Sequence, residues 1–284
     1  MMKVYVFGNR GMLGRYVESY LKSKGYDVIG VNRTNLDASD TNEIPLRSFF
    51  FHRGITVGDI IINCMGAIKP QVDKLGTLNA IKVNSLFPYI LANVCEERGI
   101  HLIHITTDCV FTGNDGNYTE KSLHDCTDVY GKTKSLGEPS NCTVVRTSII
   151  GEEIGTSRSL IEWVKAQDGK TVNGYLNHRW NGLTCHQVAK VFEKIIKEEK
   201  YWMGVRHVYS PESLNKCDLV KSIAHAHKLN IEVTPVDAPT KCDRTLATSV
   251  YDEETFVPYS LTFDIPHIQT QLEEQYNNPP KLII

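Results

Sequence analysis

A tyrosine and a lysine one helical turn apart are the first pair in this chain with an evident chemistry. Tyr130 and Lys134 stand at i and i+4 of a helix predicted over residues 130–137, so they share one face. The ammonium would lower the pKa of the phenol from about 10, and such a phenol can give a proton to a carbonyl oxygen as hydride arrives. Tyr20 and Lys24 repeat the spacing on the first predicted helix, away from any strand's carboxyl end, so we assign them to packing and surface.

A threonine completes the predicted catalytic group. Thr107 follows a strand predicted over residues 101–106, and its hydroxyl could hydrogen-bond a substrate carbonyl and orient it toward Tyr130. Ligands of an open α/β sheet bind at the carboxyl ends of its strands, which is where this residue stands. Thr107, Tyr130 and Lys134 are therefore the predicted catalytic trio. A threonine pair, Thr106 and Thr107, that only caps the strand is the alternative.

A glycine-rich turn separates the first predicted strand (residues 4–7) from the first predicted helix (residues 11–24). It reads Gly8-Asn9-Arg10-Gly11-Met12-Leu13-Gly14, a GxxGxxG spacing rather than GxGxxG. In this context the glycines permit a tight turn, a close backbone approach to a pyrophosphate and close helix–strand packing. The phosphates would meet free N–H groups at the helix N-terminus. We predict a dinucleotide site over these seven residues, an ordinary strand–turn–helix being the alternative.

The end of the second predicted strand (residues 27–31) selects the dinucleotide. An NAD site needs a carboxylate there to accept a hydrogen bond from the ribose, whereas this chain has Asn32 and Arg33. The guanidinium of Arg33 suits a 2′-phosphate, and Arg10 could add a second cation. Asp37 is a weaker candidate for a ribose contact. We therefore predict NADPH over NADH, with a solvent-facing Arg33 as the alternative.

The elements that must position these side chains alternate between strand and helix. Strands are predicted over residues 4–7, 27–31, 59–64, 101–106 and 143–147, and helices over 11–24, 78–98 (with a kink at Pro88) and 130–137. Short apolar strands separated by helices predict a parallel sheet covered on both faces, a Rossmann-type doubly wound α/β fold. Beyond residue 150 we predict helices over 159–167, 185–200 and 214–227, strands over 206–209 and 232–234, a polar loop over 168–181 and a frayed tail from Gln275.

Composition excludes several classes of protein. The 284 residues carry 31 Lys and Arg against 33 Asp and Glu, a net charge of −2, so there is no basic surplus for nucleic acid. No apolar run approaches the roughly 18 residues that cross a bilayer. The chain opens on a strand rather than a signal peptide, and its eight cysteines contain no CxxC pair. We expect a cytoplasmic protein with free thiols, no membrane contact and no metal site.

Six motifs in this order resemble the extended short-chain dehydrogenase/reductases, and among them the dTDP-4-dehydrorhamnose reductase family. They are GNRGMLG (8–14), IINCMGA (61–67), TTDCVFTG (106–113), YTE (118–120), YGKTKSLGE (130–138) and VVRTSIIG (144–151). The resemblance implies NADPH-dependent reduction of the C4 ketone of a UDP- or dTDP-4-keto-6-deoxyhexose. It also implies the same catalytic trio, and it places Asn63, Met65 and Gly66 along the dinucleotide groove.

Cys109 departs from the family pattern, because many members carry tyrosine there. The cysteine is similar to that of enzymes that both epimerise and reduce a keto-sugar, such as plant-type rhamnose synthases and GDP-fucose synthase. A thiolate of depressed pKa could remove protons at C3 and C5. Likeness to the plant-type enzymes favours Lys170 as the group that returns the proton, and likeness to fucose synthase favours His178. The product would be a nucleotide-L-rhamnose-type sugar; a small pocket-wall residue at position 109 is the equal alternative.

The predicted substrate site draws on several segments. Arg179 could pair with a diphosphate and Trp180 could stack on a base or sugar. Arg244 resembles the arginine of a late Arg-x-Leu segment of the family and is a second phosphate candidate. The predicted substrate-binding residues are Asp108, His178, Arg179, Trp180 and Arg244. A surface loop with one packed tryptophan is the alternative for residues 177–184.

Two domains and two further functions complete these expectations. We predict an NADP-binding Rossmann domain of residues 1–150 plus about 183–210, and a smaller C-terminal α/β domain for the sugar nucleotide of about 151–182 plus 211–284. A homodimer is left open. One other function is a 4-reductase without epimerase activity, acting on another nucleotide 6-deoxy (amino)sugar. The other is a non-catalytic NADP-binding regulatory subunit, similar to the β-subunit of methionine adenosyltransferase.

Overall fold

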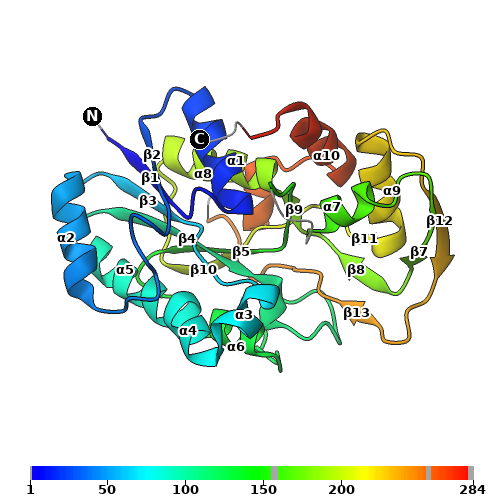
Figure 1. Cartoon of the computed structure of the whole chain (residues 1–284), viewed down its shortest axis with the longest axis horizontal. Helices are drawn as coiled ribbons and strands as arrows, with labels where there is room; N and C mark the ends of the chain where they lie inside the picture. Colours follow the sequence, from blue (N-terminus) through cyan, green and yellow to red (C-terminus); the bar gives the residue numbers. More distant parts are fainter. Residues whose placement is uncertain (1, 155–158, 254–256, 281–284) are drawn as a thin grey trace.

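A six-stranded parallel sheet forms the centre of the computed structural model, which describes residues 2–154, 159–253 and 257–280 (Figure 1). Its order is β10-β5-β4-β3-β1-β2. These strands are β1 (Val4–Phe7), β2 (Val28–Val31), β3 (Ile60–Asn63), β4 (His101–Thr107), β5 (Thr143–Thr147) and β10 (Gly204–His207). The chain crosses from one side of β1 to the other between β2 and β3, so the switch point where ligands of such sheets bind lies at the carboxyl end of β1. The predicted doubly wound α/β fold is confirmed.

Helices cover both faces of this sheet, which explains why β1, β2 and β3 consist almost entirely of apolar residues. On one face α1 (Met12–Ser23) packs beside α8 (Cys185–Lys197), over Val4, Val6, Ile60 and Ile62. On the other face α2 (Glu43–Arg53) and α5 (Phe87–Glu97) cover Tyr5, Phe7 and Ile61. Consecutive residues of one strand thus enter opposite cores, as the alternation of strand side chains requires.

The helix predicted over residues 78–98 is interrupted. It divides into α4 (Thr77–Ile81), a π-helical turn η1 (Lys82–Leu86) and α5, whose first turn contains Pro88. A proline has no N–H to give to the carbonyl four residues earlier, so the irregular turn falls just before it. Three short elements lie near the carboxyl ends of the strands: α3 (Lys69–Leu75), the 3₁₀ turn η2 (Asp108–Val110) and α6 (Val129–Ser135).

The C-terminal half holds small sheets and three further helices. The helices are α7 (Leu160–Lys165), α9 (Lys216–Ala226) and α10 (Ile268–Asn277), with a 3₁₀ segment η3 (Tyr259–Phe263). Strand β7 (Thr171–Tyr175) pairs with β12 (Glu232–Val236), and β6 (Ile149–Ile150) pairs with β9 (Leu183–Thr184). A three-stranded sheet has the order β11 (Leu214–Asn215), β8 (His178–Trp180) and β13 (Cys242–Asp243).

Two sequence predictions for the C-terminal half were wrong, and one helix in the N-terminal half was missed. The segment predicted as a polar loop over 168–181 contains β7 and β8, because its polar residues pair with strands from beyond residue 210. Helix α2 was not predicted. The tail predicted to fray from Gln275 begins inside α10, where the side chain of Gln275 is 1% exposed and its Oε1 accepts a hydrogen bond from the His186 N–H.

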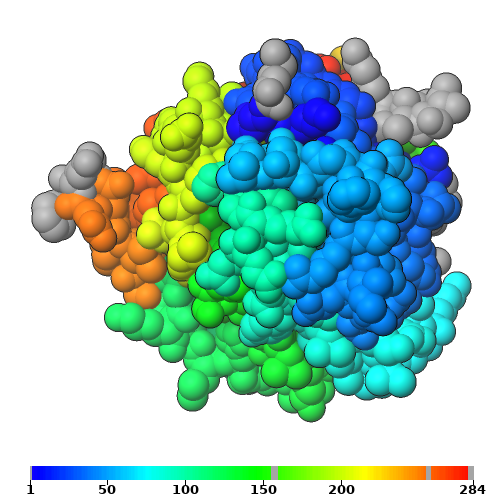
Figure 2. Space-filling view, turned by 90° about the vertical axis from the view of Figure 1, so that its left-hand side faces the viewer, coloured from blue at the N-terminus to red at the C-terminus, as the bar shows by residue number. Residues whose placement is uncertain are grey.

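Apolar side chains gather in two clusters on the faces of the large sheet and in a third between α7, α9 and α10. The first cluster also takes in Tyr259 and Phe263, and Tyr259 meets Trp202 edge to face. Figure 2 shows the orange segment that follows β13 beside the yellow segment that contains β10. Residues beyond 250 thus help to cover the large sheet, and the predicted two-domain division stays a prediction. Within the described ranges, no helix is long and apolar enough to cross a membrane.

Candidate active site

Two adjoining cavities open at the carboxyl ends of β1, β3 and β4. The first has a volume of ≈ 440 Å³ and reaches the end of β2, and the second has a volume of ≈ 480 Å³ and reaches α6. Both are of the size that small-molecule sites occupy. They share Arg10, Gly11, Cys64, Met65, Gly66, Ala67 and Gln71 as walls. The two cavities therefore adjoin along the edge of the sheet, and the second cavity alone reaches from the glycine turn to α6.

The glycine turn is shaped by close backbone contacts. Gly8 has φ +81°, and a Cβ there would lie 3.0 Å from backbone atoms of Cys64. A Cβ on Gly14 would lie 2.2 Å from the carbonyl oxygen of Gly8, so only glycine fits at this position in the first turn of α1. Gly11 is the N-cap of α1 and offers no side-chain cap. The first N–H groups of the helix are therefore left for a ligand in the second cavity, which Gly11, Met12 and Leu13 line.

Arg15 is a site residue that the sequence reading missed. It lies in the first turn of α1, lines the second cavity and is only 7% exposed. One Nη donates to the carbonyl of Glu152 at 3.4 Å, while Nε is buried without a hydrogen-bond partner among the described residues. Together with Arg10 it places two guanidinium groups at the N-terminus of α1. The available signal was an arginine directly after the third glycine of the turn.

Two asparagines predicted to bind the cofactor lie behind the cavity walls. Asn9 is buried, and its Nδ2 donates to Glu18 at 2.8 Å. Asn63 is fully buried; its Nδ2 meets Nδ1 of His104 at 3.1 Å, and its Oδ1 accepts from the Met65 N–H at 3.1 Å. Asn63 therefore fixes the backbone of Met65, which does line the site.

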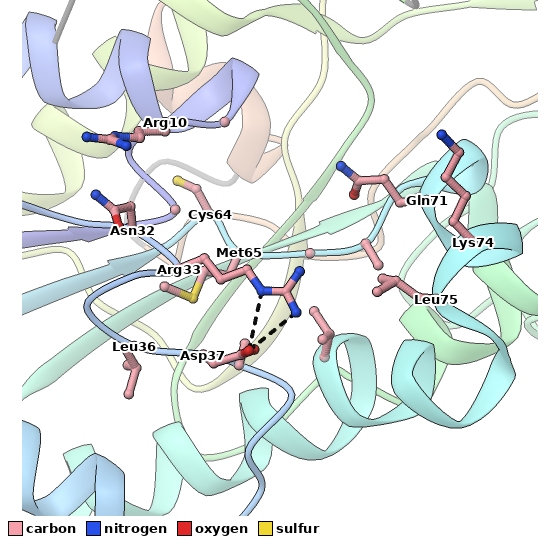
Figure 3. A pocket seen from close by; sticks show the side chains of 16 residues that line it. Arg10, Asn32, Arg33, Leu36, Asp37, Cys64, Met65, Gln71, Lys74 and Leu75 are labelled. Carbon is pink, nitrogen blue, oxygen red and sulfur yellow. Dashed lines mark hydrogen bonds and ion pairs between the residues drawn. The ribbon is translucent and has the colours of Figure 1, made fainter. Parts of the chain in front are cut away.

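The end of β2 carries the predicted selector of the dinucleotide. Nε and Nη2 of Arg33 each donate to Asp37 at 3.3 Å, and the Arg33 side chain remains 70% exposed. Figure 3 shows this pair on one wall of the first cavity, with Gln71 and Lys74 of α3 on the facing wall. Asn32 lines the same cavity. The sequence reading predicted Asn32 and Arg33 but had no reason to select α3.

The predicted catalytic trio converges on the second cavity. Thr107, Tyr130 and Lys134 all line it, although they come from β4 and α6. Nζ of Lys134 donates to the Ile105 carbonyl at 3.1 Å, and burial lowers the pKa of this ammonium to about 8. The N-terminus of α6 is set by Asp128, whose carboxylate accepts the Gly131 N–H at 2.8 Å. The lysine is thus held beside the tyrosine within the site.

The expected lowering of the phenol's pKa is not found. Burial of Tyr130 and the nearby Cys109 raise the pKa of its hydroxyl above the usual value, and hydrogen bonding with Thr107 only partly opposes them. Burial dominates because the low-dielectric wall disfavours the phenolate. Tyr130 is consequently protonated across the physiological range, the form that can donate a proton.

Cys109 lines the second cavity, but its electrostatics differ from the expectation. Its N–H donates to Oγ1 of Thr107 at 3.2 Å. Burial and the neighbouring Asp108 raise the pKa of the Cys109 thiol to about 12, so the depressed pKa that a thiolate base would require is not found. Asp108 also lines this cavity, and burial raises the pKa of its carboxyl.

Other predicted residues lie elsewhere. Lys170 is exposed and donates to the Ala166 carbonyl at 2.8 Å, and one ring nitrogen of His178 contacts the Thr240 carbonyl at 2.9 Å. Arg179 is exposed on β8, and Trp180 packs into the third apolar cluster. Lys170, His178, Arg179 and Trp180 are not among the walls of either cavity.

Arg244 stands directly beside the second cavity. Its Nε donates to the Phe111 carbonyl at 2.9 Å, and its guanidinium interacts electrostatically with Asp108 and Cys109. Among the described residues, no group of three or more His, Cys, Asp or Glu side chains could hold a metal ion. The site therefore combines a row of cations, a helix N-terminus and a tyrosine acid, and each residue's role in binding or catalysis stays a prediction.

The chain is similar in sequence or in fold to several known proteins. A dTDP-4-keto-6-deoxy-D-glucose reductase of Streptomyces niveus is 33% identical over 152 residues, 50% of this chain and 51% of the relative. Methionine adenosyltransferase 2 subunit beta of Danio rerio is 26% identical over 251 residues, 80% of this chain and 74% of the relative. A solved dTDP-4-dehydrorhamnose reductase of Bacillus anthracis in complex with NADP shares the fold with a TM-score of 0.77 at 20% identity, covering 96% of this chain and 98% of that one.

These similarities cover different shares of the chain and of its relatives. The chain spans about half the length of the first curated relatives it matches, 51%, 45% and 53% of them. The family model described as "RmlD substrate binding domain" matches residues 2–278. The expected resemblance is confirmed, and the chain belongs to the RmlD substrate-binding domain family.

Proposed function

We propose that this protein uses NADPH to reduce the C4 ketone of a dTDP- or UDP-4-keto-6-deoxyhexose. The observation that carries the proposal is the meeting of Thr107, Tyr130 and Lys134 in a cavity continuous with the glycine turn. A dinucleotide along the turn and a ketone beside Tyr130 would both contact the second cavity, which Gly11 and Tyr130 line. Relatives named as reductases of such sugars support the choice of substrate.

Each residue of the predicted trio has a separate role in the proposed reaction. NADPH, when bound along the turn, supplies the hydride. Tyr130 gives its proton to the C4 oxygen, and its raised pKa keeps that proton in place until the oxygen becomes basic. Thr107 donates a hydrogen bond that orients the ketone, and the Lys134 ammonium stabilises the negative charge left on the phenolate.

The choice of NADPH rests on charge in the first cavity. Arg10, Arg33 and Lys74 line it with Asp37 as the opposing carboxylate, and Arg33 is exposed enough to turn toward a 2′-phosphate. The solved Bacillus anthracis relative is a complex with NADP. Titration of the wild-type protein should give a lower Kd for NADPH than for NADH, and the reverse order would refute the assignment.

Epimerisation at C3 and C5 is the finer part of the proposal. Its support is the position of Cys109 in the same cavity as the trio. Because the pKa of this thiol is raised, epimerisation would require a base that takes its proton when substrate is bound. Reaction in deuterium oxide should label C3 or C5 in the wild type and not in Cys109→Ser; equal labelling of both would remove Cys109 from the mechanism.

Absorbance of NADPH with dTDP- and UDP-4-keto-6-deoxyglucose, and with their 3,5-epimers, tests the main proposal. We expect oxidation of NADPH with at least one of them, and NMR of the product identifies the nucleotide, the stereochemistry and any epimerisation. The alternative is a non-catalytic subunit, supported by the likeness to methionine adenosyltransferase 2 subunit beta over 80% of this chain. Tight NADPH binding without oxidation of NADPH by any of these sugars would favour that alternative.

A further inference from the structure

Lys216 is a cation that neither the predicted site nor the cavity walls include. It is the first residue of α9 and directly follows β11. Asn215 of β11 and Asp243 of β13 both pair with Arg179 of β8, one from each side. The next residues along the chain, Lys216 and Arg244, therefore leave the three-stranded sheet on the face opposite to Arg179. Figure 1 shows β8, β11 and β13 together, away from β1 and β2.

The neighbours of Lys216 agree with this placement. Its ammonium interacts electrostatically with Asp108, Cys242 and Arg244. Burial lowers its pKa below the usual value, and Arg244 adds to the lowering. Within the described residues, Lys216 makes no hydrogen bond or ion pair. Lys216 is half-buried, and a partly desolvated ammonium beside a guanidinium is unfavourable unless an anion joins them.

Arg244 is fixed beside the second cavity by tight packing. A Cβ on Gly113, whose φ is +92°, would lie 2.8 Å from Sγ of Cys242 and 3.0 Å from Cγ of Arg244. The Asp243 N–H donates to the Gly113 carbonyl at 2.7 Å, and Nε of Arg244 donates to Phe111. The terminal Nη groups of Arg244 have no hydrogen-bond partner among the described residues, and they remain for a ligand.

Among the described residues, neither cation of this pair forms an ion pair with a carboxylate. Asp108 is the carboxylate that interacts with both, and burial raises its pKa. Asp125 also interacts with Arg244, but its Oδ1 already accepts the Thr112 N–H at 2.7 Å. Asp128 is a more distant neighbour of Arg244, and it is already paired with Lys69 at 2.9 Å. A diphosphate carries negative charge on both phosphoryl groups and can accept from a lysine and an arginine at once.

We propose that Lys216 and Arg244 together bind the diphosphate of the nucleotide-linked substrate, on the far side of Asp108 and Cys109 from the glycine turn. The inference rests on the proposed function for the class of substrate. It adds Lys216 as a residue that decides the affinity for sugar nucleotides without touching the reacting carbon. The cofactor's own phosphates would lie at the other end of the site, near α1.

Calorimetric titration of the NADP-saturated protein with dTDP, and with thymidine as the probe that lacks phosphate, tests the pair. Lys216→Met should weaken dTDP binding by about tenfold or more and leave thymidine binding unchanged, because a charge-assisted hydrogen bond is lost. Lys216→Arg should restore dTDP binding. Lys221→Met is the matched control on the same helix, where the lysine is half exposed and 3.9 Å from Asp218; it should bind dTDP as the wild type does.

Two results would overturn the proposal: wild-type affinity for dTDP in Lys216→Met, or an equal loss of thymidine and dTDP binding. If Lys216→Met fails to fold, Lys216→Gln and the wild type decide. Inorganic pyrophosphate should then compete with dTDP on the NADP-saturated wild type, and an absence of competition contradicts the proposal. A protein that binds dTDP through Lys216 yet oxidises no NADPH would retain this site while losing the proposed reaction.

Discussion

The dinucleotide end and the sugar end of the site are built in different ways. At the first end, the turn from Gly8 to Gly14 and the residues after β3 follow directly from neighbouring strands of the large sheet, and the Gly8 N–H donates to the Val31 carbonyl at 2.7 Å. At the second end, the loop after β4 is held by a segment more than a hundred residues later. Tyr118 forms a bridge with Leu246, and the Tyr118 N–H donates to the Thr245 carbonyl at 2.9 Å. The first end is drawn from residues 8–83 at the ends of adjacent parallel strands, whereas the second end depends on pairing between segments more than a hundred residues apart.

Where the two ends meet, the largest effect is expected. Tyr130→Phe removes the proton donor and should lower kcat by about 1,000-fold, the scale of general acid catalysis, while the Kd for NADPH stays within about twofold. Stopped-flow absorbance and a fluorescence titration measure the two quantities. Tyr20→Phe is the matched control, because Tyr20 and Lys24 repeat the spacing outside both cavities. Unchanged kcat in Tyr130→Phe would contradict the assignment.

Damage to the dinucleotide end should affect the cofactor. A methyl group on Gly14 would lie 2.2 Å from the Gly8 carbonyl oxygen, which is backbone and cannot move aside without displacing α1. Gly14→Ala should therefore weaken NADPH binding by about 100-fold, equivalent to about 3 kcal/mol. Gly25→Ala is the control without a steric clash: its φ is positive, at +87°, but no atom lies within 4 Å of the added Cβ. NADPH affinity in Gly25→Ala should match the wild type, and a loss as large as that of Gly14→Ala would show that the steric argument fails.

Damage to the sugar end should affect the sugar nucleotide instead. Gly113→Ala places a Cβ 2.8 Å from Cys242 and strains a positive φ, so it should push Arg244 away from Asp108. We expect KM for the sugar nucleotide to rise about 30-fold with little change in the Kd for NADPH. Initial rates and NADPH titrations on the same preparation make the comparison. A loss of NADPH affinity equal to that of Gly14→Ala would mean that the two ends are not separable.

The same contrast explains what the sequence could predict. The strands of the large sheet, α1, the turn and the trio were predictable because each depends on apolar runs, glycine spacing or an i, i+4 pair. The pairing of β8 with β11 and β13 was not, since short polar strands acquire their partners only in the folded chain. Trp180 was predicted to face a ligand, but α9 and α10 close over it. Lys216 carries no motif at all, and only the folded sheet brings it toward Arg244.

The YTE motif illustrates the same point within a predicted family signature. The carboxylate of Glu120 accepts the Ser249 N–H at 2.7 Å and the His207 N–H at 2.9 Å, so it ties the loop after β4 to β10 and to the segment after β13. The YTE sequence indicates a family, whereas the structure shows that Glu120 holds distant segments of the chain together. The sequence therefore identified Glu120 as part of a motif, but the contacts that Glu120 makes could be seen only in the folded chain.

The smallest expected effect is the pH dependence of kcat/KM, which distinguishes the titration of Lys134 from that of Tyr130. Burial lowers the pKa of Lys134 to about 8, while that of Tyr130 is raised, so the lysine is the group that titrates first as pH rises. Below this pKa the ammonium is charged and can stabilise the phenolate; above it the charge is lost. We expect kcat/KM for the sugar nucleotide to fall about tenfold between pH 7 and pH 9, with an inflection near 8. Lys134→Met should be slow and show no inflection there, because its side chain cannot titrate. A flat wild-type profile from pH 6 to 10 would exclude the lysine's charge from the rate, and the trio would then reduce to Tyr130 and Thr107.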